Sequence, residues 1–176
     1  MCADERHVFA TGFSNGAMMS NRVGCELSEK FHGIAPVAGN IRENANFPRC
    51  EPKESVAWLS ICGDIDGACK NDFAQTAIRW KDFNGCTAGP SPTFVSATTK
   101  CAEYTNCKGG SFVEYCEIAG LGHEWSGRPR PDGSSPVQSP TNIDATAYIF
   151  DRFSTLVGGD YPRFYNDTSF RFNRAA

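Results

Sequence analysis

Residues 12–16 read Gly-Phe-Ser-Asn-Gly, a pentapeptide whose central Ser14 could serve as a nucleophile. Residues 7–11 before it are mostly apolar or β-branched and predict a buried strand, and residues 17–23 after it predict a helix. A serine at the apex of a sharp strand-to-helix turn is exposed for attack on a carbonyl carbon. Glycines at 12 and 16 fit this interpretation, because larger side chains there would collide with the neighbouring strand or helix. We therefore predict that Ser14 is a catalytic nucleophile.

A serine hydroxyl becomes a strong nucleophile only when a base takes its proton and an acid orients that base. Asp64 and Asp66 follow the buried strand expected at residues 56–62, and His123 follows the last expected strand, at 111–118. We expect these side chains to meet Ser14 at the carboxyl ends of the strands. Their position alone leaves both aspartates as candidates for the acid.

The base can be chosen by elimination, because the chain has only 3 histidines. His7 begins the strand that carries Ser14, so we expect it on the surface at the opposite end of the sheet. His32 lies near the end of the helix expected at 15–30, where a charged imidazole would interact favourably with the helix dipole. His123 lies in a glycine-rich loop and is the predicted base.

Strand and helix patterns alternate along the chain, which predicts an α/β fold with a mostly parallel sheet covered on both faces. We assign residues 1–158 to one domain that begins at the nucleophile strand, and residues 159–176 to an irregular tail. The segments 39–54, 87–92 and 126–140 are predicted loops. Strands are expected at 6–11, 34–38, 56–62, 93–101 and 111–118, and helices at 15–30, 72–83 and after a cap at 141–144.

The composition excludes several classes of function. The chain has 176 residues, 40% of them hydrophobic, and a net charge of −3, which suits one globular domain with a substantial core. No basic patch indicates a nucleic-acid partner. No apolar run approaches the roughly 18–20 residues of a membrane span, so we predict no membrane association. The polar segment 1–6 carries no signal-peptide pattern.

The chain has 9 cysteines, and none of their spacings forms a Cys-x-x-Cys pair, so we expect no zinc site. Disulfides formed in an oxidising compartment explain them better, and the odd count leaves at least one thiol free or paired outside this chain. Together with a glycosylation sequon at 166–168, they favour a portion of a longer secreted protein over a cytosolic protein with many thiols. Candidate disulfide pairs are Cys25 with Cys86, and Cys107 with Cys116.

Four segments together resemble the polyhydroxybutyrate depolymerase-like esterases, a group that includes the carbohydrate esterase family 1 feruloyl and acetylxylan esterases. Residues 8–19 resemble the nucleophile segment of that family, and residues 34–39 resemble its following strand. Asn84-Gly85-Cys86 is similar to its Asn-Gly-Cys. Residues 122–127 resemble its Gly-His-x-Trp-Pro-Gly, with Ser126 in place of the proline. The resemblance spans roughly residues 5 to 155.

This resemblance implies an α/β-hydrolase fold and hydrolysis of a carboxylic ester through an acyl-enzyme on Ser14. It places the catalytic acid on Asp66, because the family's His-Gly-x-x-Asp corresponds to Cys62-Gly63-Asp64-Ile65-Asp66. Asn15 would donate its backbone N–H to the oxyanion, with no metal or cofactor. Phe13 and Trp125 are the candidate pocket residues; Trp125 could equally be a core or loop anchor.

The same resemblance implies cell-wall feruloyl or acetyl esters, or polyhydroxyalkanoate, as substrates. The chain departs from the family at Cys62, where a histidine is usual, and at 68–70, where Val-Pro is missing. Because the turn that carries the nucleophile stands at residue 14, the chain lacks the strands that precede this turn in the family. We therefore expect a carboxyl-terminal part of such an enzyme: a fragment, a truncated gene model or a degenerate copy. The alternatives are a non-catalytic remnant that binds a partner, and a serine peptidase of the same fold.

Overall fold

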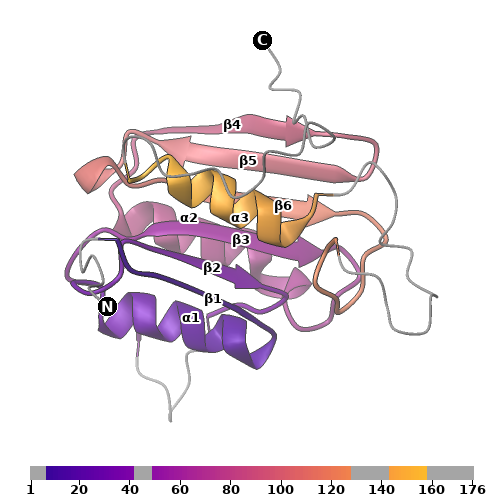
Figure 1. Cartoon of the computed structure of the whole chain (residues 1–176), viewed down its shortest axis with the longest axis horizontal. Helices are drawn as coiled ribbons and strands as arrows, with labels where there is room; N and C mark the ends of the chain where they lie inside the picture. The colour runs from indigo at the N-terminus through magenta and orange to yellow at the C-terminus, as the bar shows by residue number, and fades with distance from the viewer. Residues whose placement is uncertain (1–6, 42–48, 128–142, 158–176) are drawn as a thin grey trace, which may run out of the picture.

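Figure 1 shows the computed structural model of the chain, which describes residues 7–41, 49–127 and 143–157. These residues form a six-stranded sheet in the order β1-β2-β3-β6-β5-β4, with helices on its two faces. The fold is therefore α/β, as the alternating pattern predicts. The elements are β1 (Phe9–Phe13), α1 (Asn15–Glu26), β2 (Gly33–Val37), β3 (Ala57–Gly63), η1 (Lys70–Asp72), α2 (Phe73–Phe83), β4 (Ala88–Val95), β5 (Thr99–Thr105), η2 (Lys108–Gly110), β6 (Val113–Ile118) and α3 (Ala145–Ser154).

The strands that carry the candidate site run parallel to one another. β1 pairs with β2, β2 with β3 and β3 with β6, all in parallel, whereas β5 and β4 pair antiparallel with their neighbours. Every residue of β2 and β3 is buried, as expected for strands covered on both faces. The prediction of a mostly parallel sheet is confirmed for these neighbouring strands.

The edge strand β4 contradicts one prediction. Most of the segment 87–92, which we predicted to be a turn-rich link, belongs to β4. Pro90 and Pro92 lack an N–H, and an edge strand tolerates them because it has no further neighbour to bond on one side. The single strand predicted at 93–101 is divided between β4 and β5 by a turn, in which Ser96 N–H donates to the Thr99 carbonyl over 2.8 Å.

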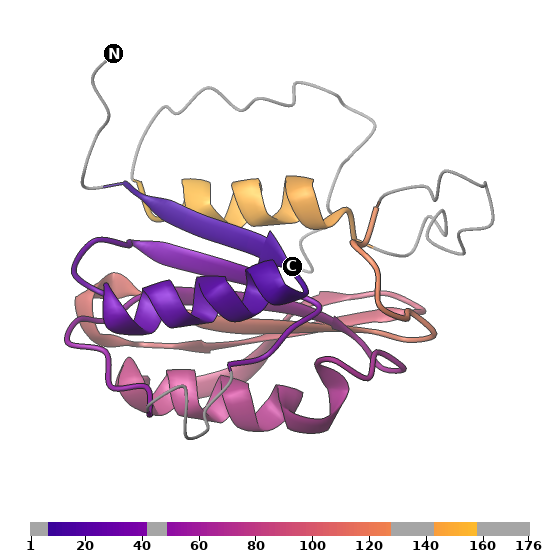
Figure 2. The same cartoon turned by 90° about the horizontal axis from the view of Figure 1, so that it is seen from below.

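The helices divide between the two faces of the sheet. Figure 2 shows α3 on one side and α1 and α2 on the other. Leu59 and Ile61 of β3 pack in one core cluster with the apolar side of α3, and Trp58, which directly precedes Leu59, packs in another with residues of α1 and α2. This alternation follows from the two-residue period of a strand, which sends successive side chains to opposite faces.

A buried amide joins the two helices that share a face. Asn21 of α1 is fully buried, and its Oδ1 accepts hydrogen bonds from the indole N–H groups of Trp58 (3.0 Å) and Trp80 (3.1 Å). This one acceptor connects α1 to β3 and α2, so it helps to fix the position of the helix that follows Ser14. Trp80 is itself fully buried in the core.

Both disulfide pairings predicted from the sequence are wrong, although the expectation of disulfides is right. Cys101 and Cys116 stand directly opposite each other on antiparallel β5 and β6, so the strand register selects that pair. The ninth cysteine, Cys2, lies outside the described residues. The bonds are Cys25–Cys50, Cys62–Cys69, Cys86–Cys107 and Cys101–Cys116.

The ends of the helices also differ from expectation. α1 ends at Glu26 rather than at residue 30, so His32 lies beyond the helix and does not serve its dipole. At the start of α3, Asp144 accepts a hydrogen bond from Ala147 N–H over 2.9 Å, as a capping residue does.

Among the described residues, no helix is long and apolar enough to cross a membrane. The predicted tail at 159–176, the sequon at 166–168 and most of the loop at 126–140 lie outside the described residues.

Candidate active site

Ser14 has the backbone conformation expected of a nucleophile at a sharp turn. It stands between β1 and α1 with φ 56° and ψ −113°, a region that non-glycine residues rarely adopt. A Cβ on Gly12 would lie 2.5 Å from the Gly16 carbonyl carbon, and one on Gly39 would lie 2.7 Å from the Ser14 carbonyl oxygen. A Cβ on Gly16 would meet nothing within 4 Å, so the collision expected at both glycines applies only to Gly12.

The Ser14 side chain points toward His123 instead of capping its own helix. Ser14 is the N-cap residue of α1, yet its hydroxyl makes no capping hydrogen bond. Its Oγ lies 2.8 Å from His123 Nε2, and its N–H donates to the Val37 carbonyl over 3.0 Å. The neighbouring strand β2 thus holds the backbone of the turn while the hydroxyl stays free for the imidazole.

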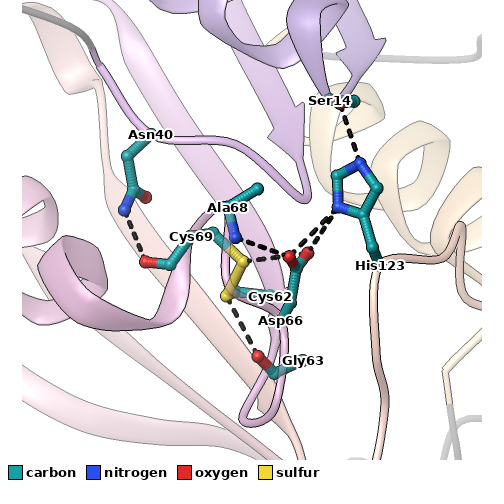
Figure 3. Close-up of polar contacts among 8 residues, drawn as sticks. All are labelled: Ser14, Asn40, Cys62, Gly63, Asp66, Ala68, Cys69 and His123. Atoms are coloured by element: carbon teal, nitrogen blue, oxygen red, sulfur yellow. Dashed lines mark hydrogen bonds and ion pairs between the residues drawn. A yellow bond between two sulfur atoms is a disulfide. The ribbon is translucent and has the colours of Figure 1, made fainter.

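Asp66 lies behind the imidazole, as Figure 3 shows. His123 Nδ1 is 3.1 Å from Asp66 Oδ1 and 3.0 Å from Oδ2. The carboxylate is almost fully buried (1% exposed), whereas the imidazole is 42% exposed. With Nδ1 as the donor to this carboxylate, Nε2 carries the lone pair that can accept the proton of Ser14 Oγ. The arrangement can therefore activate a serine and stabilise the imidazolium that results.

Asp64, the other candidate acid, has a different partner. Its Oδ1 accepts a hydrogen bond from the Gly120 N–H over 2.8 Å. Beside it, a Cβ added to Gly63 would lie 1.9 Å from the Leu121 carbonyl oxygen, so the two loops touch through their backbones. Asp64 therefore ties the turn that holds Asp66 to the loop that leads to His123. The geometry favours Asp66 as the acid.

Helix α3 anchors the other side of the His123 loop. The Trp125 indole N–H donates to Thr146 Oγ1 over 3.0 Å, and Trp125 packs against the core on that face of the sheet. The Ser126 carbonyl accepts from Ala145 N–H over 3.0 Å, and the Ser126 hydroxyl donates to the Ile143 carbonyl. These contacts favour the anchoring role for Trp125 over the pocket role.

Phe13 and Asn15 lie on either side of the nucleophile. Phe13 is 38% exposed, and its ring centroid lies 4.7 Å from that of His123. Asn15 is the first residue of α1, and the first N–H groups of a helix have no partner within it. An apolar side chain and an available amide therefore lie next to Ser14, in the positions expected of a substrate contact and an oxyanion donor.

The two other histidines lie away from Ser14. His7 precedes the first residue of β1, whereas Ser14 follows the last. The ring centroids of His7 and His32 lie 5.7 Å apart. Both line a cavity of about 540 Å³ together with Ser28 and Glu54. Of the three histidines, only His123 contacts the predicted nucleophile in this structure.

The described residues offer one cluster with metal-ligand chemistry, formed by Cys101, Glu114 and Cys116. The two sulfur atoms are bonded to each other in a disulfide, so neither is a thiolate that could bind a metal. Glu114 instead belongs to a buried charged group with Arg152, Glu103 and Tyr148, which we call the Glu114 cluster. The chemistry of Cys101, Glu114 and Cys116 therefore favours a structural role for these residues over metal binding.

The Glu114 cluster joins α3 to strands β5 and β6. Arg152 Nε lies 2.6 Å from Glu114 Oε2, an ion pair without hydrogen-bond alignment, and Arg152 Nη2 lies 2.5 Å from Glu103 Oε1. Burial raises the pKa of the Glu103 carboxyl; Arg152 opposes this shift and Glu114 adds to it. Burial, and then the Glu114 charge, also raise the pKa of Tyr148, so its hydroxyl stays protonated and donates to Glu114 over 2.5 Å.

Replacing Arg152 with methionine should lower the free energy of unfolding by about 3–5 kcal/mol, because it leaves the buried Glu114 carboxylate without its cation. Urea denaturation would measure this. Replacing the exposed Lys100 of β5 with methionine is the control and should change stability by less than about 0.5 kcal/mol. Equal losses in the two variants would contradict a special role for the buried cation.

Two features of the site had no clear signal in the sequence. The hydrogen bond from Gly120 to Asp64 depends on how two distant loops meet. The Cys62–Cys69 disulfide encloses Asp66, and the only hint was that these two cysteines flank the acid closely. Both features lie around the carboxylate rather than around the serine.

No protein-family model matches the chain. The chain is 31% identical over 143 residues to feruloyl esterase B of Piromyces equi, an alignment that covers 69% of this chain and 26% of that protein. It is 28% identical over 159 residues to feruloyl esterase D of Neurospora crassa, covering 88% of this chain and 51% of that protein. It therefore spans about a quarter of the first relative and about half of the second.

A solved structure has a similar fold. The acetyl xylan esterase from Aspergillus awamori superimposes with a TM-score of 0.54 at 18% sequence identity, covering 69% of this chain and 56% of that chain. At this identity the likeness concerns the fold alone. It agrees with the α/β architecture described above.

Proposed function

We propose that this chain carries the catalytic triad of a serine carboxylic-ester hydrolase, with Ser14 as nucleophile, His123 as base and Asp66 as acid. One observation carries the proposal: the 2.8 Å contact between Ser14 Oγ and His123 Nε2, with the Asp66 carboxylate on the opposite ring nitrogen. The expected order of nucleophile, acid and base along the chain and the names of the related esterases support it. The finer placement among the α/β-hydrolases and polyhydroxybutyrate depolymerase-like esterases belongs to the same proposal.

The first half of the reaction forms an acyl-enzyme. Ser14 Oγ attacks the ester carbonyl carbon while His123 Nε2 takes its proton, and Asp66 stabilises the charged imidazole. The Asn15 N–H donates to the oxyanion, and the positive end of the α1 dipole favours the same charge. His123 then gives the proton to the leaving alcohol, and the acyl group remains on Ser14.

The second half releases the acid. Water loses a proton to His123 and attacks the acyl carbon, and the tetrahedral intermediate collapses with return of the proton to Ser14 Oγ. Asp66 keeps the same hydrogen bond to His123 in both halves, so the ring does not need to turn. Every proton transfer in this scheme uses His123 Nε2.

The relatives and Phe13 support a proposal for the substrate class. The related proteins are named as feruloyl and acetyl xylan esterases, so we propose cell-wall feruloyl or acetyl esters as substrates, with polyhydroxyalkanoate as the alternative. Phe13 presents an exposed ring beside His123, where an aromatic acyl group could pack. The disulfides in the structure support an extracellular location for the protein.

A fluorophosphonate probe tests the proposal. We expect it to label the folded chain, with peptide mapping placing the label on Ser14, and we expect p-nitrophenyl acetate and methyl ferulate to be hydrolysed. A folded chain without labelling or hydrolysis would contradict the proposal and favour the non-catalytic alternative. Faster cleavage of a peptide amide than of either ester would favour the serine peptidase.

Replacing Phe13 with alanine should raise KM for methyl ferulate about fivefold, because an aromatic contact is worth on the order of 1 kcal/mol. The same change should leave KM for p-nitrophenyl acetate within about twofold, since an acetyl group has no ring to pack. Steady-state kinetics on both esters would measure the difference. Equal changes for the two substrates would contradict a role for Phe13 in binding the acyl group.

A further inference from the structure

A short covalent ring encloses the candidate acid. Cys62, near the end of β3, is bonded to Cys69, just before η1, across a sequence separation of 7. Asp66 lies between them, and both half-cystines are buried, with 2% and 1% of their surface exposed. The disulfide therefore closes the turn that carries the carboxylate directly onto the strand.

The disulfide also touches the reactive carboxylate. Cys69 Sγ lies 3.3 Å from Asp66 Oδ2, the oxygen that lies 3.0 Å from His123 Nδ1 (Figure 3). A disulfide sulfur carries no proton, so it occupies this side of the carboxylate without donating a hydrogen bond. Oδ2 thus remains an acceptor for the imidazole.

The remaining contacts of the turn hold it in the same orientation. Asp66 Oδ1 accepts from Ala68 N–H over 2.8 Å, and the Asp66 carbonyl accepts from Lys70 N–H over 3.0 Å. The side-chain amide of Asn40, from the loop after β2, donates to the Cys69 carbonyl over 2.5 Å. Each of these contacts is a single hydrogen bond. The disulfide is the covalent cross-link that joins the far end of the turn back to β3.

We propose that the Cys62–Cys69 disulfide is a positioning element for Asp66 and sustains turnover by holding the carboxylate against His123. The inference rests on the proposed esterase function and deepens it. Both cysteines are buried beside Asp66, so we expect neither to contact the substrate or the reacting atoms. Their effect should therefore appear in kcat, through the orientation of His123, and not in the binding of the ester.

Replacing both cysteines with alanine tests the inference. We expect kcat for p-nitrophenyl acetate to fall about 10- to 100-fold with KM nearly unchanged, since a misplacement of about 1 Å costs on the order of 100-fold. The matched control removes the Cys86–Cys107 disulfide, which links the residues after α2 to those after β5. Its kcat should stay within about threefold of the parent.

A cycle with Asp66→Asn separates positioning from general stability. If the disulfide acts through the carboxylate, removing it in the Asp66→Asn background should change kcat no further. A loss that multiplies with that of Asp66→Asn would overturn the inference, as would a cysteine double variant with the parent's kcat. Absence of both probe labelling and hydrolysis in the folded parent would instead refute the proposed function itself.

Folding of the variants is checked by circular dichroism and thermal melting. If the alanine pair fails to fold, Cys62→Val with Cys69→Ala refills part of the buried volume without restoring the link. A kcat loss in that folded variant would support the positioning role. If neither pair folds, the disulfide is a general stabiliser of the fold, and the inference is wrong.

Discussion

Replacing Ser14 with alanine is expected to lower kcat for p-nitrophenyl acetate by about 10⁴- to 10⁶-fold, the range seen when a serine nucleophile is removed. The hydroxyl that lies 2.8 Å from His123 Nε2 is the only group the proposal assigns to attack the ester. Without it no acyl-enzyme can form, and fluorophosphonate labelling should disappear as well. The measurement is steady-state hydrolysis, with labelling followed on the same samples.

Ser20→Ala is the matched control, on the same helix. Ser20 is buried, and its hydroxyl donates to the Gly16 carbonyl over 2.8 Å, so the substitution removes an equivalent group without touching His123. We expect its kcat to stay within about threefold of the parent, because losing one local hydrogen bond costs stability by about 1 kcal/mol and not chemistry. Residual hydrolysis in Ser14→Ala equal to that of the control would contradict the assignment of the nucleophile.

Replacing Asp66 with asparagine should lower kcat by about 10³- to 10⁴-fold, because an amide cannot stabilise the imidazolium and can hold the ring in the wrong tautomer. The matched control is Asp64→Asn, in the same turn. An asparagine oxygen at 64 can still accept from the Gly120 N–H, so kcat should stay within about threefold. The two variants differ only in which carboxylate loses its charge.

The comparison decides between the two aspartates. A large loss in Asp64→Asn with a small one in Asp66→Asn would reverse the assignment made from the distances to His123. Equal losses in both would mean that the charge of the whole turn matters more than the individual hydrogen bond. Only a loss confined to Asp66→Asn agrees with the proposed triad.

The predictions from the sequence were most accurate where residues with catalytic side chains lie in a segment with a strong local apolar pattern. The strand, the sharp turn and the helix around Ser14 are local features with a strong apolar pattern, and the structure has them within a few residues. The choice of His123 needed only the positions of three histidines relative to the strands. The structure brings Ser14, Asp66 and His123 together as expected.

The sequence predicted least where long-range pairing decides. Pro90 and Pro92 indicated a link, but an edge strand has one side without a partner and accepts them. The bond between Cys101 and Cys116 depends on an antiparallel register that no local pattern specifies. We predicted that a larger side chain at either Gly12 or Gly16 would collide with the neighbouring strand or helix. In the structure only a side chain at Gly12 would do so.

The contact between the proposed nucleophile and the proposed base joins residues that are far apart along the chain. Ser14 and His123 are separated by 109 positions, and the loop that carries His123 is anchored by α3, which follows it in sequence. Closing such a long loop costs entropy before the contact can form, so we expect this contact to form late in folding. We therefore expect a partly folded chain to hold Ser14 without its proposed base, and the proposed reactivity toward esters to arise only when the last elements have packed.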